Sequence, residues 1–201
     1  MCFSAKASLG AFLVGLVGSL FLVSLGGRTN VSFGVFFIFI SLIQLMDLAI
    51  WMDLGNKIGV NRVATTIGPL LNVGQPLIMY LIKIVVFNKQ GFDIVTGLNV
   101  LYTLYLAKIY YQFIDKETGV TKVEHGHLKW PWLQYANPAA YLIMFIINAL
   151  YLTEQWFSLL VTSITGFFLF FSHSYFAHHV GEMWCYFGAF IPMLVYLLGR
   201  K

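Results

Sequence analysis

The amino-acid sequence predicts an all-α fold: a bundle of seven membrane-spanning helices in one integral membrane domain over residues 1–201, with a short β-hairpin between helices four and five. Three observations predict it. Apolar residues make up 59% of the chain and charged residues only 10%, against roughly 45–50% and about 25% in soluble domains. Apolar runs of about 20 residues recur, the helix length that crosses a bilayer. Turn-forming residues separate these runs. The lipid bilayer is therefore the expected partner, because a soluble fold has too little polar surface to cover this excess.

Turn and capping residues set the limits of the predicted helices. Gly26 and Gly27 end the first helix, whose apolar run is too long for a signal peptide. Gly55 ends the second helix. Asn137 and Pro138 are typical of a helix start, as the capping residue and the first residue of the fifth helix. In chain order, we expect helices at residues 5–25, 31–54, 61–87, 92–114, 138–152, 154–176 and 181–198.

The third predicted helix contains two helix-breaking sequences, Gly-Pro at residues 68–69 and Gly-Gln-Pro at residues 74–76. Such breaks free backbone carbonyls, which are tolerated at membrane depth only where protein or water satisfies them. One interpretation is a packing kink. The other is a hinge or binding site, as in transporters with discontinuous helices, and it would use Asn72 and Gln75.

Chemistry-bearing side chains gather at one end of the predicted bundle. Because helices alternate in direction, the starts of odd-numbered helices and the ends of even-numbered ones share an end, here named the N-terminal end. The loop between helices four and five lies there, and its valines alternate with polar residues before Gly126, which predicts the hairpin. Trp130 and Trp132 are expected at the membrane interface. This end receives all histidines and cysteines of the chain: His125, His127, His173, His178, His179, Cys2 and Cys185.

Gln44, Asp47 and Trp51 form one stripe on the second helix, because they are spaced at i, i+3 and i+7. Asp47 lies roughly 9 Å inside the helix end at 1.5 Å per residue. A carboxyl group there is costly and should face the interior with a partner. Lys108 lies at matching depth on the fourth helix, and we predict that it contacts Asp47. The alternative is a protonated Asp47 and a Lys108 side chain that extends to the interface.

Two further pairings are predicted at the N-terminal end. His178, Glu182 and Cys185 fall at i, i+4 and i+7, and a zinc ion could be held there by His173, His178, His179 and Glu182. The alternative is that these histidines only form hydrogen bonds at the interface. Cys2 and Cys185 both lie near helix starts and could form a disulfide. Two separate buried thiols are the other interpretation.

Short motifs resemble an uncharacterised family of multi-pass membrane proteins, the MCFSA type, found in bacteria, algae and large DNA viruses. The matching segments are residues 1–5 (MCFSA), Ala7-Ser8, residues 126–130 (GHLKW) and residues 184–187 (WCYF). The resemblance also implies a stripe of Gln, acid and Trp on helix two, which Gln44, Asp47 and Trp51 match. The family commonly has Glu where this chain has Asp47, which shortens the reach by one methylene. No established activity follows from the resemblance.

Three better-known seven-helix classes fit less well. A retinal protein needs a lysine inside its last helix, and residues 181–198 contain none, so no retinal is expected. Ceramidase-like zinc hydrolases carry a His-x-x-x-His pair on the last helix, which is absent here. Sugar carriers with Pro-Gln kinks have two copies of the kink, whereas this chain has Gln75-Pro76 once and Pro192 alone.

The sequence leaves three hypotheses for function. The first is a small-solute or ion carrier, channel or receptor-like bundle, whose pathway uses Gln44, Asp47, Trp51, Asn72, Gln75 and Lys108. The second is a membrane-embedded, zinc-dependent hydrolase. The third is a structural membrane protein, for example of a virion, without a site. No basic run suggests nucleic acid as a partner.

Orientation follows from the lysines and arginines. Seven of the twelve fall at the N-terminal end, a count that favours this end inside, but several of them lie in the longer hairpin loop beside acids. The short loop at Lys89 and the tail at Arg200 and Lys201 point the other way. We therefore place the N-terminus outside and the C-terminus inside.

Overall fold

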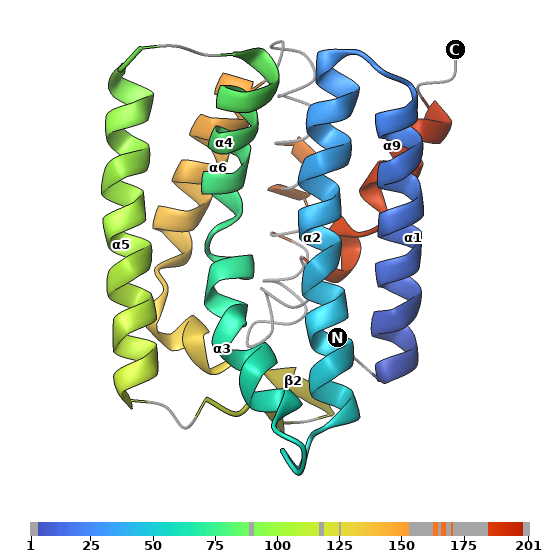
Figure 1. The fold of residues 1–201 in the computed structure, drawn as a ribbon, viewed down its shortest axis with the longest axis vertical. Coiled ribbons are helices and arrows are strands. Elements are labelled where there is room, and N and C mark those ends of the chain that lie inside the picture. The colour runs from blue at the N-terminus through green and yellow to red at the C-terminus, as the bar shows by residue number, and fades with distance from the viewer. Residues whose placement is uncertain are drawn as a thin grey trace.

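The computed structural model shows a bundle of helices with a two-stranded sheet at one end (Figure 1). It describes residues 4–88, 91–116, 119–124, 126–152, 163–164, 166–167, 170 and 185–198. The elements in chain order are α1 (Ala5–Ser24), α2 (Arg28–Met52), α3 (Val60–Asn72), α4 (Gln75–Phe87), α5 (Ile94–Lys116), β1 (Lys122–Glu124), β2 (His127–Lys129), a 3-10 turn (Pro131–Tyr135), α6 (Pro138–Leu152) and α9 (Ile191–Leu198). The predicted helix at residues 154–176 and the start of the one at 181–198 fall largely outside the described residues.

The helices have the composition of a membrane protein. Within the described ranges, α1 and α2 are long and apolar enough to cross a bilayer, and α3 with α4 make a third such unit if they are counted as one span. Large apolar side chains such as Leu13, Leu20, Leu45, Leu101 and Leu104 are exposed on the outside of the bundle. Exposed apolar surface of this extent marks contact with lipid or another protein. The structure thus supports membrane insertion and leaves the number of spans to the sequence prediction.

Small residues bring α1 close to its neighbours. A Cβ atom on Gly15 would lie 2.2 Å from the Ser41 hydroxyl of α2, and one on Gly34 would lie 2.7 Å from the backbone oxygen of Ser19. Glycine is needed at both positions because it allows the backbones to approach, as in small-residue packing between membrane helices. Gly18 packs in the same way on Met193 of α9.

The helices α1 and α9 run parallel. Their contacts advance in the same order along both helices, from Gly15 against Ala189 to the stacked rings of Phe21 and Tyr196, 5.0 Å apart. In Figure 1, α1 begins at the lower end of the bundle and α9 ends at the upper end. This is the arrangement that an odd number of alternating spans produces.

The break predicted at residues 74–76 is present and bends α4 by 61° from α3. Pro69, by contrast, lies inside α3 without ending it. Gly74 is required at the break, because a Cβ there would lie 2.1 Å from the Leu70 backbone oxygen. The Tyr102 hydroxyl donates a hydrogen bond to the freed Val73 carbonyl at 2.9 Å. A protein side chain therefore provides the hydrogen bond that the freed carbonyl needs in a membrane interior.

The predicted hairpin is confirmed as an antiparallel pair of strands, in which Val123 lies opposite Leu128. Thr121, just before β1, is fully buried and joins the hairpin to α3. Its backbone N–H donates to Asn61 Oδ1, and its carbonyl accepts from Asn61 Nδ2, both at 3.0 Å. The hairpin is thus part of the packed bundle.

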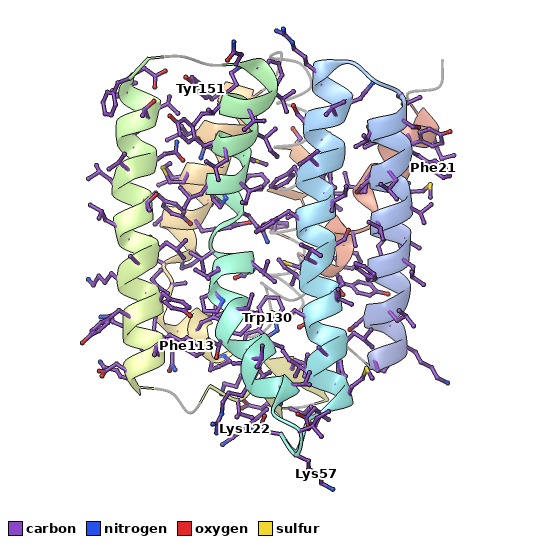
Figure 2. The ribbon with its side chains drawn as sticks, in the orientation of Figure 1. Phe21, Lys57, Phe113, Lys122, Trp130 and Tyr151 are labelled. Carbon is purple, nitrogen blue, oxygen red and sulfur yellow. The ribbon has the colours of Figure 1, made fainter. Side chains whose placement is uncertain are left out.

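The prediction that Trp130 and Trp132 lie at the interface was wrong. They are 2% and 0% exposed, and their rings stack with centroids 5.1 Å apart. Gly68 leaves the space for Trp132, since a Cβ there would lie 2.2 Å from that ring. Figure 2 shows Trp130 between the lower parts of α2 and α3. The two indoles are buried because the segment that follows the hairpin folds inward and places their rings in the core.

Candidate functional site

Four polar side chains meet where α3 gives way to α4. They are Asn72, the last residue of α3, Gln75, the first of α4, Tyr141 of α6 and Cys185, and we name them the break site. Asn72 Nδ2 and Gln75 Nε2 each lie 3.6 Å from the Cys185 sulfur, and the Tyr141 hydroxyl donates to Gln75 Oε1 at 2.5 Å. The predicted pathway residues Asn72 and Gln75 are therefore brought together in the interior.

The geometry of the break explains why these side chains converge. Pro76 lacks a backbone N–H, so the α3 ladder cannot continue through it, and the chain turns between Asn72 and Gln75. The side chains of both residues then point into the bundle, where Gln75 and Cys185 are fully buried and Asn72 is 6% exposed. The break site consequently lies about 18 Å along α3 from its start at Val60, at 1.5 Å per residue.

The bonds at the break site are unequal in strength. Sulfur is a weak hydrogen-bond acceptor, so the two amide N–H groups that face Cys185 are held less firmly than amide N–H groups bonded to oxygen. The Gln75 carbonyl oxygen, in contrast, is bonded to the Tyr141 hydroxyl. The Asn72 amide thus offers an N–H donor that can pass from the sulfur to a better acceptor.

The stripe on α2 faces the interior, as predicted. Gln44 and Asp47 are both fully buried, and Trp51 is half-buried beside them. Asp47 Oδ1 accepts a hydrogen bond from Trp130 Nε1 at 2.9 Å. Among the described residues, neither the Gln44 amide nor the Trp51 N–H has a hydrogen-bond partner. A buried amide without a partner costs about 1–3 kcal/mol, which marks Gln44 as a position where a bound molecule would add stability.

The predicted contact between Asp47 and Lys108 is wrong. Lys108 is exposed on α5, on the same face as the exposed Leu101, Leu104 and Tyr111. Asp47 instead accepts from Trp130, on the segment after the hairpin. Lys108 is near enough to the helix end for its long side chain to reach the interface, so it needs no buried partner. It is therefore removed from the candidate site.

The predicted metal ligands His173, His178, His179 and Glu182 lie outside the described residues, as do His125 and Cys2. Within the described ranges, no group of three His, Cys, Asp or Glu side chains could hold a metal ion. Cys185 is buried, and the disulfide with Cys2 stays a prediction because Cys2 lies outside the described residues. The contacts of Cys185 with Asn72 and Gln75 also place it deeper in the bundle than the N-terminal end, where the sequence placed it.

A second polar group supports the break from the side of α5 and α6. Asn99 and Asn148 each donate an amide N–H to the other's carbonyl at 2.9 Å, and Asn148 Nδ2 also donates to the Pro76 backbone oxygen at 2.9 Å. Sequence reasoning missed this pair, together with Tyr141. The available signal was an asparagine inside each of two apolar helices, since intramembrane polar residues are expected to pair.

The loop between α2 and α3 is held by Asp53. Its carboxylate accepts hydrogen bonds from four backbone N–H groups, those of Lys57, Ile58, Val60 and Asn61, at 2.7 to 3.4 Å. Burial raises the pKa of Asp53, but these four bonds together lower it further, and the pKa lies below its ordinary value. This loop fixes the direction in which α3 leaves α2.

No protein-family model, no curated protein and no solved structure matches the chain. The resemblance to the MCFSA-type family therefore stays a prediction. The fold and the site define the class of protein: a helical protein suited to lipid, with polar side chains gathered inside it at a helix break.

Proposed function

We propose that this chain is a seven-span membrane protein that binds a small polar solute or ion at the break site and carries it across the bilayer. The observation that supports this most is the convergence of Asn72, Gln75, Tyr141 and Cys185 at a helix break in an otherwise apolar interior. Buried polar groups at membrane depth are costly, and they mark solute and ion pathways. Broken helices supply such sites in secondary transporters.

The chemistry of the break site favours a solute that carries oxygen acceptors. The N–H groups of Asn72 and Gln75 face the weak acceptor Cys185, and a carbonyl, hydroxyl or carboxylate oxygen would accept them more strongly. For the Asn72 amide, exchanging the sulfur acceptor for an oxygen of the solute would replace a weak hydrogen bond with a stronger one. The Tyr141 hydroxyl can in turn accept from a donor on the solute when it rotates away from Gln75.

Asp47 and Gln44 provide a second polar site on the proposed solute pathway. α2 packs against α4, so the stripe on α2 and the break site line one interior. Gln44 lies about 12 Å from the end of α2 at Met52, at 1.5 Å per residue. Asp47 lies on the same helix between Gln44 and that end. The Asp47 carboxyl is the ionisable group on this route, and it is tied to the hairpin segment through Trp130. We place the N-terminal end outside the cytosol, because the short loop at Lys89 and the basic tail at Arg200 and Lys201 favour the opposite end inside.

The test is flux through proteoliposomes. Shrinkage and reswelling with glycerol, urea and glycine, followed by light scattering, would be compared between wild type, Gln75→Ala and Asp47→Asn. Lys108→Gln is the matched control, because it removes the charge of an outward-facing side chain without changing the buried site. We expect solute entry above that of empty liposomes, a reduction in the first two variants and wild-type flux in the control. Wild-type flux in both site variants would contradict the proposal.

A further inference from the structure

A groove on the outside of the bundle runs between α2 and α3. It has a volume of about 650 Å³, within the range of about 300–1,000 Å³ typical of ligand pockets. Every side chain that lines it is apolar, including Leu45 and Ala49 of α2 and Val63 and Ile67 of α3. Leu45, Val63 and Ile67 are also exposed, so the groove is open to the surroundings of the bundle.

The groove has the length of one bilayer leaflet. Its lining on α3 extends from Val60 to Leu71, which is about 16 Å at 1.5 Å per residue. The hydrocarbon core of a bilayer is about 30 Å thick, so one leaflet takes up about half of that. The groove ends at Ile58 and Gly59, in the loop at the N-terminal end of the bundle. It therefore spans from the level of the helix break to the level expected for lipid headgroups.

The end of the bundle where the groove opens is positively charged. Lys57, next to the lining residue Ile58, is exposed, and Figure 2 shows Lys57 and Lys122 at this same end. The nearby Asp53 carboxylate keeps its negative charge, but it is buried at 5% exposure and faces four backbone N–H groups, whereas the Lys57 side chain is exposed. An anionic group at the mouth of the groove would gain from this charge, since basic residues near a membrane surface attract anionic lipids.

We propose that the groove between α2 and α3 holds one acyl chain of an anionic phospholipid, whose headgroup lies at Lys57. The length, the apolar lining and the charge at one end match a phospholipid in one leaflet. A helix of a second copy, about 10–12 Å across with its side chains, would suit a groove of this kind less well than a single flexible chain. The proposal depends on the membrane location of the protein and not on its transport activity.

Native mass spectrometry tests it. Wild-type protein in nanodiscs of phosphatidylcholine and phosphatidylglycerol would be released, and the lipids that stay bound would be counted. Ile67→Trp and Leu45→Trp fill the groove from opposite sides at exposed positions, and Leu104→Trp, exposed on α5, is the matched control. We expect one retained phosphatidylglycerol, a loss of about tenfold or more in both groove variants and no loss in the control.

The same measurement on Lys57→Gln tests the proposed contact between the lipid headgroup and Lys57, and Lys122→Gln is the control at the same end of the bundle. We expect a lower ratio of phosphatidylglycerol to phosphatidylcholine only for Lys57→Gln. Equal retention in the filled variants would refute the acyl-chain site, and equal retention of both lipids by wild type would refute the anionic headgroup. If the wild-type protein is a dimer and Ile67→Trp makes it a monomer, the groove binds a second copy of the chain and the lipid proposal is refuted. Size-exclusion profiles of Ile67→Trp and Leu45→Trp, run separately, show which of them is folded.

Discussion

The hydrogen bond between Trp130 and Asp47 gives the sharpest test of how the hairpin joins the candidate site. Trp130→Phe keeps an aromatic ring but removes the N–H that donates to Asp47 Oδ1 at 2.9 Å. Both partners are almost fully buried, with exposures of 2% and 0%, so water cannot replace the lost donor. A hydrogen bond to a charged group contributes about 1.5–3 kcal/mol in proteins, and one between neutral groups about 0.5–1.5 kcal/mol. Polar contacts inside membrane proteins average about 0.6 kcal/mol and reach about 1.7 kcal/mol.

The neighbouring indole is a matched control. Trp132 is equally buried and stacks on Trp130, but among the described residues its N–H has no acceptor. Trp132→Phe therefore makes a similar loss of ring volume without losing a hydrogen bond. The difference in the free energy of unfolding between the two variants isolates the bond to Asp47. We expect Trp130→Phe to be less stable than Trp132→Phe by about 1–2 kcal/mol.

The measurement is thermal unfolding of the purified protein in detergent, followed by far-UV circular dichroism. For a chain of this size, 1 kcal/mol moves the midpoint by about 2–4 °C, so the two variants should differ by about 2–8 °C. If Trp130→Phe melts no lower than Trp132→Phe, the bond to Asp47 contributes nothing measurable, and the link between the hairpin and α2 would have to come from packing alone.

Two further predictions concern the supports of the site. Asn148→Leu removes the donor to the Pro76 carbonyl and the partner of Asn99, and it should lower stability by about 1–2 kcal/mol. Introducing Asn99→Leu as well should cost less than the sum of the single changes, and additivity in unfolding experiments would argue against the pair. The second prediction follows from the lowered pKa of Asp53. A carboxyl with a depressed pKa adds stability above its unfolded pKa, and this is lost as the pH falls through the folded value. The protection of the backbone amides in the loop between α2 and α3, measured by hydrogen exchange relative to the intrinsic rate at each pH, should therefore fall below about pH 4, and Asp53→Asn should remove that pH dependence; an unchanged protection profile in Asp53→Asn would contradict this role.

Local patterns in the sequence predicted the course of the chain well. The predicted helix at residues 138–152 coincides with α6, and α2 and α5 differ from their predicted ranges by two or three residues at each end. The break at Gly74 and the hairpin were also predicted, because glycine, proline and alternating valines act through the backbone within a few residues. The stripe of Gln44 and Asp47 was placed correctly on the buried face, since i, i+3 spacing is a property of one helix.

Contacts between distant segments were predicted poorly. Lys108 was assigned to Asp47 from matching depth, but depth does not say which way a helix is rotated about its axis. The two tryptophans after the hairpin were assigned to the interface, although indoles also fill apolar cores. Tyr141 was missed because its role depends only on the partner that α6 meets.

The sequence by itself determined that long segments of the chain are apolar enough for lipid, which segments form helices, where the third one breaks and which face of α2 is polar and turned inward. These follow from hydrophobicity and backbone chemistry, which act over a few turns of helix. Only the tertiary structure decided that Cys185 meets Asn72, 113 positions away, and that Trp130 is the partner of Asp47. Such partners depend on the rotation and tilt with which the helices pack, and many rotations bury equally apolar faces, so hydrophobic patterning alone does not choose among them.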